Sequence, residues 1–352
     1  MDDPAQSRAC GRGCTGRQRH GFALVCQSPA GFFRLAFSGW LAALFLLGFI
    51  GLALEFVFRN STAAFVLGGL MVGGAYAVLR LPKNEFLEHL TLAVSLAGQC
   101  LIIYAIFDSL DGHETAAWLA LFILQGSLAA VMPNYVHRIF SAFIAASALA
   151  MTLTSLGWPH VGGILMFLAA LCWLHEFDTA QHMEKLRAIG YGLVLALIQL
   201  KSMSLFGEQA LILELHHQKS AVWAMAWIDE VLIGCAALYV VWQLLQRHSQ
   251  AVAGRISVAA LAGTVLICAV STQMQGLTVG LVIMLLGFAG SNRVLAGLGI
   301  TSLLFYISTY YYQLDATLLA KSLNLLAVGL VLLGIRQLLE YILPEGGEVR
   351  HV

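Results

Sequence analysis

Apolar segments long enough to cross a bilayer follow one another along almost the whole chain. A spanning helix needs about 20 mainly apolar residues, and charged residues, prolines and polar clusters divide the sequence into pieces of about that length. The pattern predicts an all-α, polytopic membrane protein with about twelve transmembrane helices. Their expected ranges are 35–58, 61–80, 87–107, 115–132, 137–155, 158–175, 187–206, 221–245, 256–273, 276–290, 293–311 and 316–340.

The Lys and Arg positions predict the orientation of these helices, because cytoplasmic loops are enriched in basic residues. With twelve spans and a cytoplasmic N-terminus, fifteen of the 19 basic residues fall on the cytoplasmic side. The outer segments then hold only Arg59, Lys201 and Lys219, and Lys321 lies within the last span. We therefore expect both termini in the cytoplasm (N-in/C-in).

Local composition predicts three parts of the chain: an N-terminal tail, a membrane domain and a C-terminal tail. Residues 1–30 are rich in Arg, Gly, Ser and Gln without periodicity, which is typical of a flexible tail. The apolar run after Arg34 is longer than the core of about 7–15 residues in a signal peptide, so a retained first span is expected. The membrane domain then covers 31–342, and residues 343–352 form a cytoplasmic C-terminal tail.

Overall composition excludes a soluble globular protein and a nucleic-acid-binding protein. Charged residues make up 11% and apolar residues 59% of the 352 residues, against about 25% and 45–50% in soluble domains, and the mean hydropathy is +0.82. So few charges cannot cover a soluble protein of this size. The 19 basic and 19 acidic residues balance, whereas nucleic-acid binding requires a basic face. The expected surroundings are the lipid bilayer, and no nucleic acid is expected.

Three segments resemble one another. RIFSAFIAASALAMTLTS at 138–155 is similar to RISVAALAGTVLICAVST at 255–272, and the segment that begins at Arg34 is similar to both. Their spacing predicts three tandem four-helix units, which would share one orientation because four is an even number.

The last predicted span contains a candidate intramembrane polar site. Thr317, Lys321 and Asn324 are spaced by four and then three residues, so they share one helix face. Asp315 lies six residues before Lys321, on a different face, and is a poor partner for it. Two interpretations remain open: the lysine faces the bundle interior as an ion site, or it extends to the interface beside neighbouring tyrosines.

The span over 221–245 carries the adjacent acidic residues Asp229 and Glu230. Neighbouring helix positions are about 100° apart, so at most one of them points squarely into the interior. Their depth matches that of Lys321, which makes an Asp229–Lys321 or Glu230–Lys321 pair plausible. Such a pair is either a transport site or a structural lock between two helices.

Glu88, Ser95 and Gln99 form a polar stripe along the span over 87–107. Hydrogen bonds between helices explain this stripe without a ligand, and Gly98 would permit a close helix approach.

Histidines near carboxylates occur at 175–182 and as the pair His216 and His217. Neither group has the HExxH spacing that places two His on one helix face, so no metal or other cofactor is expected. The sequence also shows no G-x-S-x-G, no P-loop and no nucleophile–base pair of an intramembrane protease. We therefore expect no enzymatic activity.

The C-terminal third carries a family resemblance. YYYQLDATLLAKSLNLLAVGLVLL (310–333), preceded by GFAGSNR (287–293), resembles the hallmark of a bacterial family catalogued as domain of unknown function 4401 (DUF4401), and SLAGQ (95–99) agrees with a second motif of that family. The resemblance covers roughly residues 35–340. Positions singled out by these motifs and their surroundings are Glu88, Gln99, Tyr311, Asp315, Thr317, Lys321 and Ser322.

The resemblance implies a multi-pass protein of the bacterial inner membrane. Members are often encoded beside another membrane family (domain of unknown function 2157) and a small protein named for a GDYXXLXXXD motif. The family implies no activity, substrate or catalytic residue.

Two functions follow as hypotheses. The first is a permease-like transporter of a small solute or ion, in which Lys321, Asp229 and Glu230 line a cavity between helices. The second is a non-catalytic scaffold or interaction subunit of an envelope complex, with membrane proteins encoded nearby as its partners.

Overall fold

Ten α-helices make up the described part of the chain. The computed structural model describes residues 60–80, 85–158, 160–176, 183–205, 222–248, 254–271 and 276–313, together with Gly48 and scattered positions between 319 and 337. The helices are α2 (Ser61–Val78), α3 (Glu85–Ser109), α4 (Glu114–Val131), α5 (Tyr135–Ser155), α6 (Val161–Leu174), α7 (Met183–Leu205), α9 (Val222–His248), α10 (Arg255–Ser271), α11 (Leu277–Ala289) and α12 (Arg293–Gln313). This confirms the all-α class.

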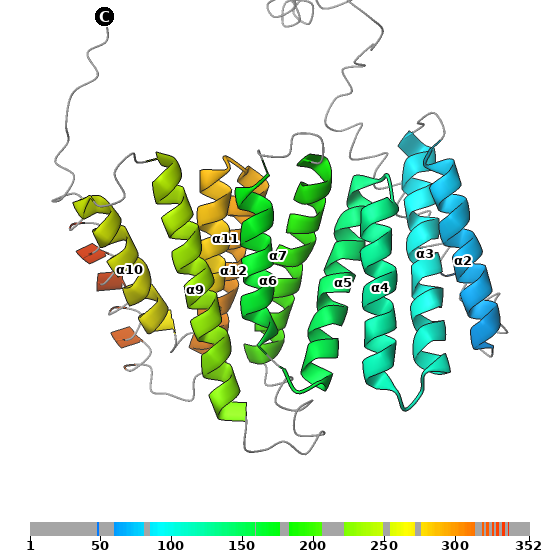
Figure 1. The fold of residues 1–352 in the computed structure, drawn as a ribbon, viewed down its shortest axis with the longest axis horizontal. Coiled ribbons are helices and arrows are strands. Elements are labelled where there is room, and N and C mark those ends of the chain that lie inside the picture. The colour runs from blue at the N-terminus through cyan, green and yellow to red at the C-terminus, as the bar shows by residue number, and fades with distance from the viewer. Residues whose placement is uncertain are drawn as a thin grey trace, which may run out of the picture.

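The helices stand side by side in a layered bundle (Figure 1). Helix α2 packs on α3, α4 on α5, and α11 on α12. Helix α5 also packs along α7, and α6 lies between α7 and α9. Helix α11 contacts α6, α7 and α9. The central helices α6, α7, α9 and α11 therefore surround one common interior.

Six of the described helices are long and apolar enough to cross a membrane, which corrects the predicted number of twelve spans. They are Ser61–Val78, Leu87–Ser109, Glu114–Val131, Tyr135–Ser155, Met183–Leu205 and Ile228–Arg247. Shorter apolar helical stretches occupy Val161–Leu174, Ser257–Ala269, Leu277–Ala289 and Arg293–Thr309. At 1.5 Å per residue, the 14 residues of α6 extend about 21 Å, less than the roughly 30 Å of a hydrocarbon core.

The physical reason for this correction is that the two shortest helices, with 14 and 13 residues, are too short to cross the hydrocarbon core and are mostly buried within the protein. Helix α6 buries nine of its 14 residues, and α11 buries eight of its 13. In the α2 span, by contrast, only 22% is buried within the protein. A helix that is apolar all round is suited either to a protein core or to lipid. Composition alone therefore overstated the number of spans.

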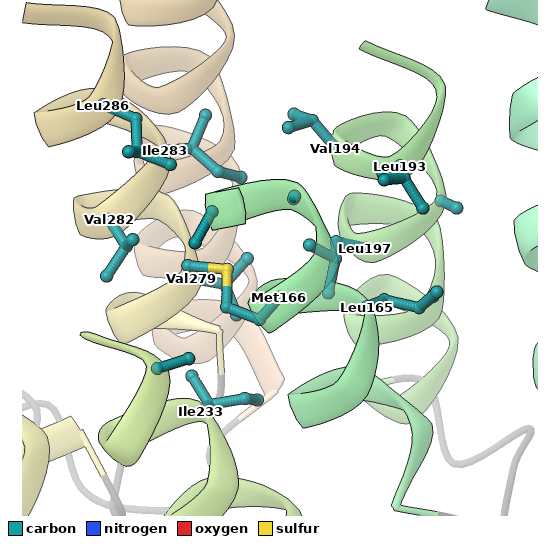
Figure 2. Packing of buried hydrophobic residues seen from close by; sticks show 14 of the residues in the cluster. Leu165, Met166, Leu193, Val194, Leu197, Ile233, Val279, Val282, Ile283 and Leu286 are labelled. Atoms are coloured by element: carbon teal, nitrogen blue, oxygen red, sulfur yellow. The ribbon is translucent and has the colours of Figure 1, made fainter. Parts of the chain in front are cut away.

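The main apolar core lies where α11 meets α6, α7 and α9 (Figure 2). Met166 of α6, Leu197 of α7, Ile233 of α9 and Ile283 of α11 are almost completely buried there. Lipid tails are as apolar as these side chains, so close packing rather than the expulsion of water holds such helices together. This packing fixes the positions of the helices that carry the charged residues described below.

Several sequence predictions fall outside the described residues. These are the spans over 35–58 and 316–340, apart from isolated positions, and the tails over 1–30 and 343–352. The N-in/C-in orientation depends on both spans and stays a prediction. The tandem repeat also stays a prediction, and its two matched helices have different surroundings: α5 packs against α4 and α7, whereas α10 packs against α9 and α11.

Candidate functional site

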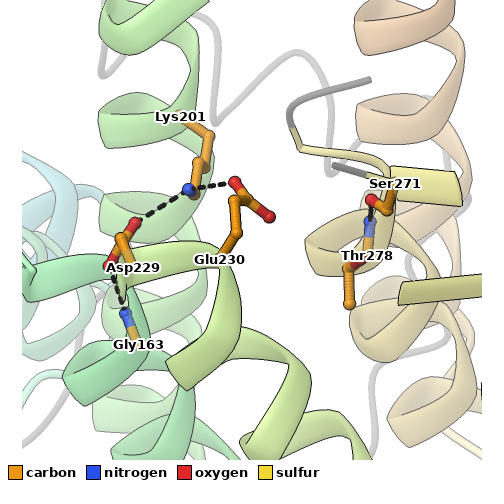
Figure 3. A network of polar contacts seen from close by, with 6 residues as sticks. All are labelled: Gly163, Lys201, Asp229, Glu230, Ser271 and Thr278. Atoms are coloured by element: carbon orange, nitrogen blue, oxygen red, sulfur yellow. Dashed lines mark hydrogen bonds and ion pairs between the residues drawn. The ribbon is translucent and has the colours of Figure 1, made fainter. Parts of the chain in front are cut away.

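Lys201, Asp229 and Glu230 form a charged triad inside the helix bundle (Figure 3). Lys201 Nζ lies 2.8 Å from Asp229 Oδ2 and 2.7 Å from Glu230 Oε1. The lysine comes from α7, and both carboxylates come from α9. The three side chains are only 7%, 14% and 13% exposed. Both ion pairs therefore form largely out of water, where leaving one partner unpaired is costly.

A backbone donor from α6 completes the partners of Asp229. The N–H of Gly163 donates to Asp229 Oδ1 at 2.9 Å, so each oxygen of this carboxylate accepts a hydrogen bond. The first N–H groups of a helix have no partner within it, and His160, at the N-cap of α6, makes no side-chain cap. Asp229 thus caps α6 from a neighbouring helix, and the positive end of the α6 dipole stabilises its charge.

Two glycines allow α9 to approach the start of α6. A Cβ on Gly162 would lie 2.6 Å from Asp229 Oδ2, and a Cβ on Gly163 would overlap the Cβ of Leu232. Because protein interiors are close-packed, a larger residue at either position would displace α9 or the carboxylate. The two glycines are therefore part of the geometry of the site.

A small pocket opens beside the triad. It is lined by Ala150, Thr154, Val161, Gly162, Leu200, Lys201, Ser204 and Asp229. Its volume is about 20 Å³, and a single water molecule needs about 10–15 Å³ on the same measure. The pocket is therefore large enough for about one water molecule and places it next to Lys201 and Asp229.

The structure adds a partner that the sequence analysis did not propose for these carboxylates. Asp229 and Glu230 both pair with Lys201, whereas Lys321, for which a pair with either of them was plausible, lies outside the described residues. The assignment of Lys201 to an outer segment is wrong: this residue is 6% exposed and lies four residues before the end of α7. The available signal was its position inside the apolar range 187–206, where a lysine requires a partner.

A second polar cluster is buried between α3, α4 and α5; its members are Ser95, Gln99, Gln125, His137 and Ser141. His137 Nε2 lies 2.8 Å from both Ser95 Oγ and Gln99 Nε2, and His137 Nδ1 lies 3.2 Å from Ser141 Oγ. Gln125 Nε2 donates to Gln99 Oε1 at 3.4 Å. Because the Gln99 amide donates to Nε2, this network assigns the histidine proton to Nδ1.

This cluster shows which partners the polar stripe of α3 meets. Ser95 and Gln99 bond to α5, and Glu88 Oε1 accepts from Asn134 Nδ2 at 2.8 Å. The close approach expected at Gly98 is present between α2 and α3, where a Cβ on this residue would lie 2.8 Å from the carbonyl oxygen of Gly68. The spacing of polar residues on α3 identifies the polar face but not its neighbours, so His137 was not singled out.

The opposite end of α6 also has charged partners. Glu176, just after α6, is 2% exposed and pairs with Arg187 of α7. Arg247 of α9 donates to the carbonyl of Leu174, the last residue of α6. Of the histidines noted in the sequence, His175 is exposed, whereas those at 182, 216 and 217 lie outside the described residues.

The C-terminal motif is described only in part. Tyr311 is half-buried in the last turn of α12, and Ser322 Oγ donates to the carbonyl of Leu319. The other candidate residues of this segment lie outside the described residues: Asp315, Thr317, Lys321 and Asn324.

Together these features show, in the part of the chain that the structure describes, an all-helical architecture with six candidate membrane spans and a buried charged site, which indicates a multi-pass membrane protein. The family model described as Domain of unknown function (DUF4401) matches residues 33–342. The chain belongs to this family, in agreement with its sequence motifs. No curated protein and no solved structure matches the chain.

Proposed function

We propose that this protein of the bacterial inner membrane is a non-enzymatic, permease-like transporter of a small ion or solute, with Lys201, Asp229 and Glu230 on its path. The observation that carries the proposal is the buried triad beside a pocket of water size. Ionisable residues at membrane depth are costly and are typical of ion pathways and proton relays. Lys321 remains a further candidate for this path.

The position of the triad supports a route from one end of the bundle. Lys201 lies four residues before the end of α7, or about 6 Å along the helix axis, at 1.5 Å per residue. Asp229 lies seven residues after the start of α9, or about 10 Å along its axis. The site is therefore inside the bundle but near one end, and Ser204, in the last turn of α7, lines the pocket.

The size of the pocket favours an ion over an organic solute. A volume of about 20 Å³ accommodates about one water molecule, and binding pockets for drug-sized molecules are typically 300–1,000 Å³. Polar lining atoms of Thr154, Ser204 and Asp229 would replace part of the hydration of a small ion.

A flux measurement tests this proposal. The purified protein is reconstituted into liposomes that contain a fluorescent pH or cation indicator, and an ion gradient is imposed. The Lys201→Met variant should lose flux, because it leaves two carboxylates without their cation. Ser127→Ala is the matched control, since this exposed hydroxyl donates to the carbonyl of Leu124 within its own helix α4. Wild-type flux in Lys201→Met proteoliposomes would refute a role for the triad.

A scaffold or interaction subunit of an envelope complex is the second candidate. It is favoured by the pairing of all three charges of the triad, which joins α7 to α9 as a structural lock would. Affinity purification in a mild detergent, followed by native mass determination, tests this function. A stoichiometric partner encoded nearby would support it, whereas elution of the protein alone would count against it.

A further inference from the structure

We infer that the ligand of the triad is a proton, held by Glu230 as a neutral carboxylic acid. The inference names the ion at the proposed transport site, and its link to transport rests on that proposed function. Proton binding itself is argued from the charges and contacts of the three side chains.

The charges of the triad do not balance when all three groups are ionised. Two carboxylates and one ammonium leave one excess negative charge, on side chains that are at most 14% exposed. An uncompensated charge in such surroundings is unfavourable, and the group neutralises instead. Uptake of one proton brings the net charge of the triad to zero without any movement of the helices.

The hydrogen bonds indicate which carboxylate takes this proton. Both oxygens of Asp229 accept bonds that favour its ionised form, from Lys201 Nζ and from the Gly163 N–H. Glu230 accepts from Lys201 Nζ through Oε1, and within the described residues no donor reaches Oε2. A proton on Oε2 preserves every bond of the triad, because Oε1 still accepts from the lysine as a carbonyl oxygen.

Within the described ranges of the chain, Lys201 is the only lysine or arginine that pairs with Asp229 or Glu230. Cys268 of α10 lies near enough to Glu230 to interact electrostatically, and the hydroxyl of Tyr306 of α12 donates to the backbone of α7 at Ile198. Both side chains are neutral in their protonated forms. His160 directly precedes the pocket residue Val161, and its imidazole can also take up a proton.

The exchange step is a simple proton transfer. A hydronium ion gives one proton to Glu230 Oε2 and becomes water, an O–H bond forms on the carboxyl group, and the charge of the triad changes from −1 to zero. Release is the reverse step. The transfer needs no oxidant, reductant or other co-reactant.

Infrared difference spectroscopy of the whole protein in detergent tests the inference. When the buffer is changed from acidic to alkaline, the wild type should lose the carbonyl stretch of one buried carboxylic acid. Glu230→Gln should lack this band. Asp229→Asn should also lack it, because the remaining Lys201–Glu230 pair is already neutral. Glu176→Gln is the matched control, since Glu176 has its own cation in Arg187, and His160→Gln should leave the band unchanged.

Persistence of the band in Glu230→Gln, or its absence from the wild type, would overturn the inference. If Glu230→Gln does not fold, as judged by circular dichroism, Asp229→Asn provides the same test, and an unchanged band there would overturn it. The result is independent of flux: a titrating band without flux supports the proton site and refutes transport, and flux without the band supports transport and refutes the proton site.

Discussion

Asp229 and Arg247, both on α9, hold the two ends of α6. Asp229 Oδ1 accepts the N–H of Gly163 in the first turn of α6, at 2.9 Å, and the Arg247 guanidinium donates to the carbonyl of Leu174 at its end. The two signs match the helix dipole, which is positive at the N-terminus and negative at the C-terminus. Helix α6, which is shorter than α9, thus obtains polar partners for both of its ends from this one neighbouring helix.

Adding a methyl group at the start of α6 should loosen this attachment. Because a Cβ on Gly163 would overlap Leu232, we expect Gly163→Ala to lower the free energy of unfolding by about 1–3 kcal/mol, the typical cost of overpacking. The measurement is thermal unfolding in detergent, followed by circular dichroism.

The control for this substitution is Gly126→Ala. Gly126 lies within α4, and a Cβ added there would have no neighbour within 4 Å, so the change should be neutral or stabilise the helix by up to about 1 kcal/mol. Equal loss of stability in both variants would show that glycine is not required at the α6–α9 contact.

Removing the cation of the triad should cost more than removing all three charges. Lys201→Met leaves Asp229 and Glu230 without their partner, and breaking a buried pair costs about 3–5 kcal/mol. The triple variant Lys201→Met/Asp229→Asn/Glu230→Gln should recover most of that loss, because it leaves no uncompensated charge. Unfolding of both proteins in the same detergent gives the comparison; equal stability would contradict the ion pairing.

The cluster around His137 should behave as one network. Gln99→Leu removes the acceptor of the Gln125 Nε2 hydrogen bond and one donor to His137 Nε2. We expect this loss to lower the free energy of unfolding by about 1–3 kcal/mol. Since Gln99 and Gln125 share a bond, adding Gln125→Leu should cost less than the sum of the single changes. A double-mutant cycle measures this coupling, and strict additivity would show that the residues are independent.

Arg138 should stabilise the end of α4. Its Nε and Nη2 donate to the carbonyls of Ala129 and Met132 at 3.0 and 2.5 Å, and the residue is 5% exposed. We expect Arg138→Met to lower the free energy of unfolding by about 1.5–3 kcal/mol, the range for hydrogen bonds of a charged group. The exposed Arg293 provides the control Arg293→Met, which should change stability by less than about 0.5 kcal/mol. Similar melting temperatures for the two variants would exclude a capping role.

The predicted orientation is tested by cysteine labelling in a background without native cysteines. Asp111 lies in the α3–α4 connection and Pro133 in the α4–α5 connection, and both are exposed. With a cytoplasmic N-terminus, Asp111→Cys should react with a membrane-impermeant maleimide on the outer side, and Pro133→Cys should react only after permeabilisation. The reverse pattern would invert the N-in/C-in topology.

Helix positions follow from the sequence more reliably than helix surroundings. The charges, prolines and turns that divide the apolar segments place each described helix within about four residues of a predicted range. The same segments do not reveal whether a helix faces lipid or protein, since apolar side chains suit both. For this reason α6 and α11 were expected to be spans, although more than half of each helix is buried within the bundle.

In the candidate site, too, the sequence identifies individual residues but not their neighbours. Asp229 and Glu230 stand out because acidic residues within an apolar segment require compensation. Which residue pairs with them depends on which helices pack together. Helix α6 packs on both α7 and α9, and no local feature of the sequence indicates these contacts. Lys201 was therefore counted among the outer segments, although it lies within the predicted range 187–206.

The two contacts of α9 with α6 have a consequence for any conformational change. They fasten α6 at both ends, through Gly163 and Leu174, so sliding one helix along the other would break both contacts at once. Helices α6 and α9 should therefore move as a single rigid body. Helix α7 is joined to this unit near its start by the Arg187–Glu176 pair and would hinge about that contact during a working cycle. The lysine near its other end would then be the member of the triad that is drawn away from its carboxylates.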